Sequence, residues 1–209
     1  MIYIVTGLPR SGTTLMMRML EVAGIEPYFN PIADPMEFGR NGSQVITNFK
    51  RRVLYETAKI RHLQQDGDDA WVKDCMGKSI KNVVFTEAVL PKEFKYKFIY
   101  MDRNLKEVSR SQNKFNRIIK KSKPKQLTAL QQKNAEAKNG TLDMIKSYPT
   151  YDFISVRFEK LLKNPKAVAS RIVEFLGVGD ATKMAECVVK RSPKCWPDLL
   201  EEKIYPRGM

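Results

Sequence analysis

Short apolar runs alternate with amphipathic stretches along most of the chain. Runs rich in Val, Ile, Tyr and Phe predict strands, and their length suits buried strands of a parallel sheet. Apolar side chains spaced three and four residues apart predict helices between them. The expected strands span residues 2–6, 70–75, 96–102 and 152–158. The expected helices span residues 14–23, 45–65, 79–90, 126–147, 166–176 and 181–190, and another begins near residue 104.

The alternation of strands and helices predicts an α/β fold, in which a mostly parallel central sheet is flanked by helices. No internal repeat or linker divides the sequence, so we expect a single domain over residues 1–209, with a basic helical elaboration at about 104–147. Gly24 is expected to end the first helix. Residues 26–43 are rich in Pro, Gly, Asn and Asp and predict a long loop, which in a compact domain is usually functional.

The composition is that of a globular and strongly basic protein. Of the 209 residues 43% are hydrophobic, which is enough for a sizeable core and excludes a wholly disordered chain. Lys and Arg number 37 against 23 Asp and Glu, so the net charge is +14. Such a charge favours phosphorylated cofactors, acidic glycans, nucleic acid or a membrane surface as partners, without choosing among them.

The cysteines and the N-terminus indicate where the protein works. Cys75, Cys187 and Cys195 are too few and too scattered for a disulfide framework or a zinc motif, so we expect reduced thiols. No leader pattern precedes the first strand, and no apolar run approaches the roughly 18 residues that cross a bilayer. We therefore expect a cytoplasmic protein without a transmembrane segment; an anchor upstream of this sequence stays open.

The segment GLPRSGTT connects the first expected strand to the first expected helix. Gly7 and Gly12 have the spacing of the loop G-x-x-x-x-G-K-[ST], which makes the expected three-layer fold P-loop-NTPase-like. The N–H groups of residues 11–14 are then expected to face an anion at the positive end of the helix. Thr13 stands at the lysine position, and Arg10 supplies a cation that can fork two oxygens of a phosphate or sulfate. The loop therefore predicts transfer of a group that needs no metal; a turn that binds nothing is the alternative.

A second anion site is expected where the strand of residues 96–102 ends. Arg103 lies at the entrance of the next helix, at the edge of a parallel sheet where ligands bind. Ser111 follows eight residues later, just over two helical turns, so both side chains can face one point. They form an oxyanion pocket, or else a surface cation and an ordinary helix serine. Asp102 is the nearest candidate for a magnesium ligand, but the arginine beside it suggests another role.

Together these two motifs resemble the sulfotransferases that use 3′-phosphoadenosine 5′-phosphosulfate (PAPS). PRSGTT is similar to the family's P-[KR]-S-G-T-T loop for the 5′-phosphosulfate, and RNLKEVSRS to its R-N-P-x-D-V-x-x-S segment for the 3′-phosphate. Residues 157–178 are similar to a third family region, Y-E-D-L-x-x-x-P…I-x-x-F-L-G. The resemblance implies a PAPS site formed by Pro9, Arg10, Ser11, Gly12, Thr13, Thr14, Arg103, Ser111 and Phe158. It implies that a sulfuryl group passes from PAPS to an acceptor hydroxyl or amine, that PAP leaves, and that no metal takes part.

The sequence departs from the family pattern in three places. Leu105 replaces the proline of the second motif. Phe158 replaces a tyrosine that lies near the adenine in relatives, so it keeps an aromatic face and loses the hydroxyl. The C-terminal R-K-G-x-x-G segment of animal cytosolic enzymes is absent, and the first motif looks closer to bacterial or tyrosylprotein-type loops.

Four residues are candidates for catalysis. Arg10 is expected to stabilise charge on the sulfuryl and bridging oxygens. Glu37 is the expected base, because tyrosylprotein-type relatives carry an acid in the corresponding loop; a solvated carboxylate is the alternative. Lys73 and Asp74 lie at the end of the second expected strand, on the same presumed edge as Arg10, as a sulfuryl contact and a base or as a plain ion pair. The single histidine, His62, is expected to be exposed on a basic helix.

The acceptor is the least defined partner. Lys78 and Lys81 either line the same edge or are solvated. Between residues 114 and 146, nine basic residues face two acidic ones. They form a solvated face that draws PAPS inward, or a groove for an acidic glycan or peptide. Two other functions stay open: a noncatalytic polyanion or nucleic-acid binder, without a recognisable nucleic-acid motif, and an atypical ATP-dependent nucleotide kinase, which Thr13 disfavours.

Overall fold

Four parallel strands form the central sheet of the computed structural model, which describes residues 1–28, 55, 69–83, 90–118, 122–189 and 192–194. Their order across the sheet is β2–β1–β3–β4. The strands are β1 (Ile2–Gly7), β2 (Ser79–Val83), β3 (Tyr96–Asp102) and β4 (Tyr151–Arg157). Since β1 pairs with both β2 and β3, the loop that follows it lies at the middle of the sheet's carboxyl edge. The predicted α/β fold class is confirmed.

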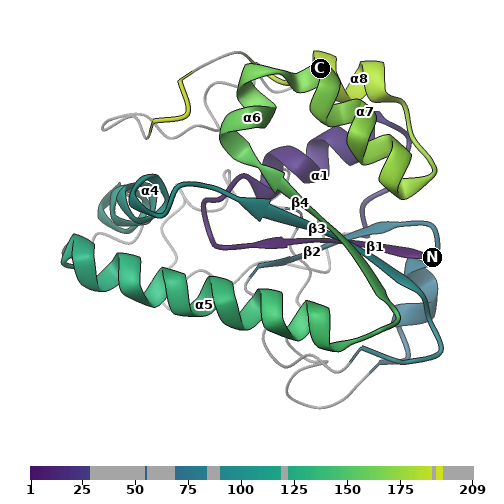
Figure 1. The fold of residues 1–209 in the computed structure, drawn as a ribbon, viewed down its shortest axis with the longest axis horizontal. Coiled ribbons are helices and arrows are strands. Elements are labelled where there is room, and N and C mark those ends of the chain that lie inside the picture. The colour runs from purple at the N-terminus through teal and green to yellow at the C-terminus, as the bar shows by residue number, and fades with distance from the viewer. Residues whose placement is uncertain (29–54, 56–68, 84–89, 119–121, 190–191, 195–209) are drawn as a thin grey trace.

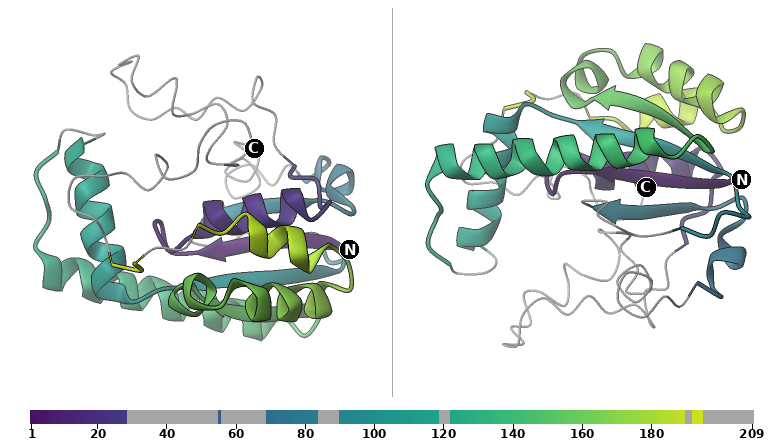
Figure 2. Two further views of the ribbon diagram at one scale, coloured as in Figure 1. Left: turned by 90° about the horizontal axis from the view of Figure 1, so that it is seen from above. Right: turned by 60° about the horizontal axis from the view of Figure 1, so that its bottom comes forward.

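Helices cover both faces of the sheet. They are α1 (Thr13–Val22), α4 (Leu105–Ile118), α5 (Leu127–Ser147), α6 (Phe158–Lys163), α7 (Pro165–Leu176) and α8 (Ala181–Glu186). Figure 1 shows α1, α7 and α8 on one face and α5 along the other. Both views in Figure 2 show α4 standing beyond the end of the sheet opposite the N-terminus. Both α4 and α5 lie within residues 104–147, and the assignment of this segment as an elaboration of the domain stays a prediction.

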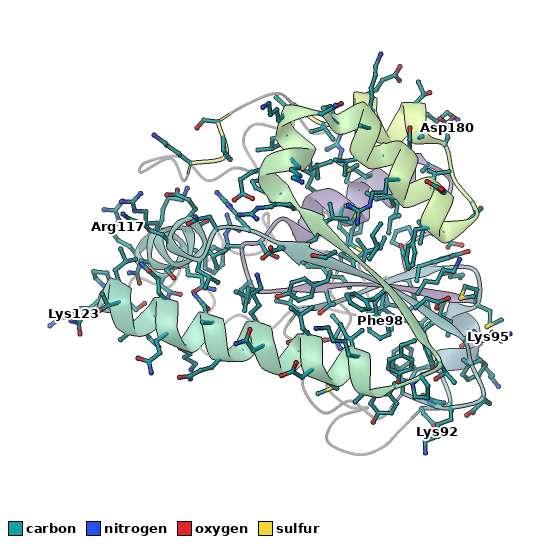
Figure 3. All side chains as sticks on the ribbon, viewed as in Figure 1. Lys92, Lys95, Phe98, Arg117, Lys123 and Asp180 are labelled. Carbon is teal, nitrogen blue, oxygen red and sulfur yellow. The ribbon has the colours of Figure 1, made fainter. Side chains whose placement is uncertain are left out.

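The core has two halves, one on each face of the sheet. Successive residues of a strand point to opposite faces, so β3 contributes Ile99 and Met101 to the half under α1 and α7. It contributes Phe98 and Tyr100 to the half under α5, where Figure 3 labels Phe98 between sheet and helix. Burial on both faces holds the strands rigidly, and the loops at their carboxyl ends therefore start from fixed points.

The second strand is not where the sequence pattern predicts it. Residues 72–75 form a short 3-10 helix, η1 (Val72–Cys75), so the predicted strand over 70–75 is wrong. Trp71, Val72 and Cys75 are buried and lie at the spacing of one side of a helical turn. The predicted helix over 79–90 is also wrong at its start, because Ser79–Val83 is β2. Its polar side chains suggest a helix face, yet they are buried by pairing with β1.

Other predictions fall outside the described residues or stay open. The predicted helix over 45–65 and most of the predicted loop over 26–43 lie outside the part of the chain that the structure describes. The single domain over 1–209 stays a prediction. Among the described residues, each helix is too short or too polar to cross a bilayer.

Gly7 offers a test of how tightly the loop is seated on the sheet. Its φ is +141°, and a Cβ at this position would lie 2.6 Å from the Met101 carbonyl oxygen. Gly7→Ala should therefore lower the free energy of unfolding by about 3 kcal/mol or more, measured by urea denaturation. Gly24→Ala is the matched control, because Gly24 has a φ of +93° with nothing within 4 Å of its would-be Cβ. It should cost only about 1 kcal/mol; equal losses would contradict this account.

Candidate active site

The loop between β1 and α1 has a strained backbone. Arg10 has a φ of +75°, a region that non-glycine residues rarely adopt and that persists where the surroundings hold it. Gly12, with a φ of +109°, is the last residue before α1. Within the loop, the Ser11 N–H donates to the Leu8 carbonyl at 3.0 Å. The chain therefore turns sharply and presents the first turn of α1 at the sheet edge.

The start of α1 can receive an anion. The first helical hydrogen bond runs from Met16 N to Gly12 O at 3.1 Å, so the N–H groups of residues 13–15 have no acceptor within the helix. They lie at the positive end of the helix dipole. The Ser11 hydroxyl is 1% exposed as a side chain and has no hydrogen-bond partner among the described residues. The Ser11 N–H is used inside the loop, and the predicted roles of Ser11, Gly12, Thr13 and Thr14 as backbone anion donors stay predictions.

Helix α4 orients the loop cation. The Arg10 Nε donates to the Ser111 hydroxyl at 3.2 Å, and Ser111 is fully buried. The Arg10 guanidinium also lies 5.4 Å from the centroid of the Phe115 ring, one turn further along α4. Both contacts constrain where the positive charge of Arg10 stands.

Arg103 holds the same loop from the end of β3. Its Nη1 donates to the Arg10 carbonyl at 3.0 Å, and its Nη2 donates to the Pro193 carbonyl at 2.7 Å. Its guanidinium lies 4.5 Å from the Phe158 ring centroid, and the residue is only 5% exposed. The two predicted anion sites therefore meet, because Arg103 and Ser111 both contact Arg10.

The ring of Phe158 packs against the loop and against Arg103. The ring is 1% exposed, and a Cβ on Gly12 would lie 2.6 Å from Phe158 Cδ2. Arg103 lies over the ring, and Gly12 packs against it. In this arrangement the ring contacts Arg103 and the loop, and its expected contact with the adenine stays a prediction.

The carboxylate at the end of β3 already has a cation. Asp102 Oδ1 accepts a hydrogen bond from Lys138 Nζ on α5 at 2.6 Å. This ion pair explains why Asp102 serves a structural role beside Arg103. Burial, and next the charge of Asp102, raise the pKa of Tyr100, so its phenol stays protonated.

Lys81 is the site residue that the motifs did not identify. It lies on β2 opposite Val5 of β1, is 3% exposed, and its Nζ donates to the Thr14 hydroxyl at 3.0 Å. Lys81 was expected either to line the ligand edge of the sheet or to be solvated, and its burial and its contact with Thr14 favour the first. Lys78 instead pairs with Glu26 at 3.5 Å, before β2 begins. The sequence left both possibilities open because residues 79–83 were expected to be helical, which hides the strand register.

Lys73 and Asp74 lie at the wrong end of the sheet for the predicted catalytic roles. Both are exposed on η1, which precedes β2, and Gly77 N donates to the Met1 carbonyl at 2.9 Å. Figure 1 shows this blue turn beside the N-terminus, at the opposite edge from α4. Their predicted placement beside Arg10 is therefore wrong. Glu37, the expected base, and His62 lie outside the described residues.

The comparisons with known proteins point in one direction. A family model described as "Sulfotransferase domain" matches residues 3–194. The fold is similar to mouse sulfotransferase SULT7A1 complexed with PAP, with 16% identity, a TM-score of 0.53, and coverage of 90% of this chain and 63% of that one. For retinol dehydratase in complex with androsterone and inactive cofactor PAP, the identity is 13%, the TM-score 0.52 and the coverage 90% and 64%. A sulfotransferase domain from the Curacin biosynthetic pathway has an identity of 14% and a TM-score of 0.53, and the match covers 92% of this chain and 79% of that one.

At such low identities the similarity is one of fold. The chain spans a little less than two thirds of the length of the mouse enzyme and of retinol dehydratase. No curated protein sequence matches the chain.

Arg103→Lys tests whether the forked contact holds the loop. Lysine makes point contacts and cannot reproduce the planar fork that reaches the carbonyls of Arg10 and Pro193 while stacking on Phe158. The substitution should lower the free energy of unfolding by about 2 kcal/mol, measured by urea denaturation. Arg110→Lys is the control, because Arg110 is exposed and pairs with Glu107 within α4. A loss no larger than that of the control would show that the fork does not stabilise the loop.

Proposed function

The chain belongs to the sulfotransferase domain family, and on that premise we propose that it transfers a sulfuryl group from PAPS to an acceptor hydroxyl or amine and releases PAP. One observation carries the proposal. Lys81 on β2 reaches the Thr14 hydroxyl at the amino end of α1, Arg10 lies in the loop that leads into α1, and the unused N–H groups there already favour an anion. The presence of PAP in two structures of similar fold supports the choice of donor.

Each end of the donor has a proposed set of partners. Arg10, the N–H groups of Thr13 and Thr14, and the Thr14 hydroxyl would bind the 5′-phosphosulfate. Arg103 and Ser111 would bind the 3′-phosphate, as the resemblance of residues 103–111 implies. Arg103 and Ser111 both contact Arg10 in the present structure. The residues proposed for the two ends of the donor are therefore in direct contact with each other.

The reaction needs positioning and charge stabilisation more than covalent help from the protein. The acceptor oxygen or nitrogen forms a bond to sulfur while the bond from sulfur to the bridging phosphate oxygen breaks, and the acceptor's proton passes to a base. Negative charge grows on the bridging oxygen, where Arg10 and Lys81 would stabilise it in a preorganised site. Glu37 stays the proposed base.

Binding of PAP in the presence of EDTA tests the donor assignment. Calorimetry with PAP should give a saturable heat in EDTA, whereas ATP should bind far more weakly with or without magnesium. A preference for ATP with magnesium would favour the kinase alternative. Salt-steep binding to an RNA or DNA oligonucleotide, with no affinity for PAP, would favour the noncatalytic polyanion binder.

Turnover of Arg10 and Lys81 variants tests the chemistry. Arg10→Ala and Lys81→Met should each lower turnover about 100- to 1000-fold, the scale of removing one preorganised donor to a developing oxyanion. The measurement is PAP release from PAPS with phenols, amines and acidic glycans as acceptor probes. Lys78→Met is the control, because Lys78 pairs with Glu26 before β2 begins. Unchanged turnover in both site variants would refute the assignment.

A further inference from the structure

The site loop is also braced from α5, through a pair of side-chain amides. On α4, Gln112 Nε2 donates to the Pro9 carbonyl at 3.0 Å and to Asn134 Oδ1 at 3.2 Å. On α5, Asn134 Nδ2 donates to Gln112 Oε1 at 3.0 Å and to the Ser109 hydroxyl at 2.9 Å. Resting on the proposed function, we propose that Gln112 and Asn134 are positioning residues that hold Arg10 in its catalytic conformation.

The amide pair is a closed arrangement. Each of its two NH₂ groups has two hydrogen-bond acceptors, so all their donors are used. Asn134 is 5% exposed and Ser109 is fully buried. A buried amide that lost a partner would leave a desolvated donor or acceptor, so the pair resists rearrangement. Gln112 is thereby fixed with one N–H aimed at the Pro9 carbonyl.

The Pro9 carbonyl matters because of its place in the backbone. It belongs to the peptide plane that enters Arg10, and the Arg10 carbonyl belongs to the plane that leaves it. Gln112 holds the first plane and Arg103 holds the second. The φ and ψ torsions of Arg10 set how those two planes are oriented relative to each other, and its φ is +75°. With Ser111 on the side chain, the backbone of a strained residue and the direction of its charge are constrained from α4 and from the end of β3.

A purely structural role makes a different prediction. If the amide pair only tied α4 to α5, its loss would weaken the site regardless of Arg10. If it acts through Arg10, its effect on turnover disappears once Arg10 has lost its side chain. Non-additivity in a double-mutant cycle separates the two.

The test is a double-mutant cycle on PAPS turnover. Gln112→Met keeps the side-chain length and removes the carbonyl and the NH₂ of the side-chain amide. In the wild-type background it should lower kcat roughly three- to tenfold, the worth of one hydrogen bond, with a smaller change in KM. In the Arg10→Ala background it should cause no further loss. Equal losses in both backgrounds would overturn the proposal, and the control Gln132→Met should leave kcat unchanged, because Gln132 is exposed on α5 and bonds to Glu136.

A second measurement keeps the inference separate from the proposed function. The Ser11 N–H, bonded to the Leu8 carbonyl, reports on the loop through its hydrogen-exchange rate by NMR. Gln112→Met should speed this exchange roughly three- to tenfold relative to Gln132→Met, while exchange in β3 stays unchanged. Unchanged exchange at Ser11 would overturn the positioning role. If the wild type failed to turn over PAPS but the exchange still rose, the proposed function would fail and the brace would stand.

Discussion

A positive-φ arginine at the edge of a parallel sheet is the constraint on which the site depends. Arg10 has an unfavourable backbone conformation, and it stays there because contacts from the end of β3 and from α4 hold its carbonyl and its side chain. Such strain is tolerated where the surrounding structure over-determines it. The surroundings here are rigid because β1 and β3 are buried on both faces. The rigid core therefore fixes the strand ends from which Arg10 is held, and with them the direction of its guanidinium.

The parallel sheet brings together charges that are far apart in the sequence. Arg10 follows β1, Lys81 lies on β2 and Arg103 follows β3, and all three strands end at one edge. Cations gathered at one edge repel one another, so their positions have to be held by other contacts. Hydrogen bonds to Ser111, Thr14 and the Arg10 carbonyl fix them. These cations favour a ligand with several negative groups, as the proposed donor would be.

The helices α4 and α5 contribute both surface charge and contacts with the site loop. The sequence shows them as a basic stretch, and Figure 3 labels Arg117 and Lys123 at the end of the molecule where α4 stands. Their charged side chains suggest a surface that attracts anions. Their uncharged polar side chains, with the Lys138–Asp102 pair, tie α5 to the end of β3 and to the site loop. The elaboration is thus joined to the proposed donor site by direct contacts.

The sequence alone determined the α/β class, three of the four strands, and the segments of the Arg10 loop and of Arg103 with Ser111. Local rules suffice for these, because glycine spacing, strand runs and helix entrances are short-range patterns. Only the tertiary structure decided that residues 79–83 are a strand, that Lys81 reaches the site while Lys73 and Asp74 do not, and that Gln112 braces the loop. Each of these depends on which strands pair and which helices pack. A polar strand such as SIKNV reads as a helix until its pairing with β1 buries it, and a glutamine has no visible partner until α5 lies beside it.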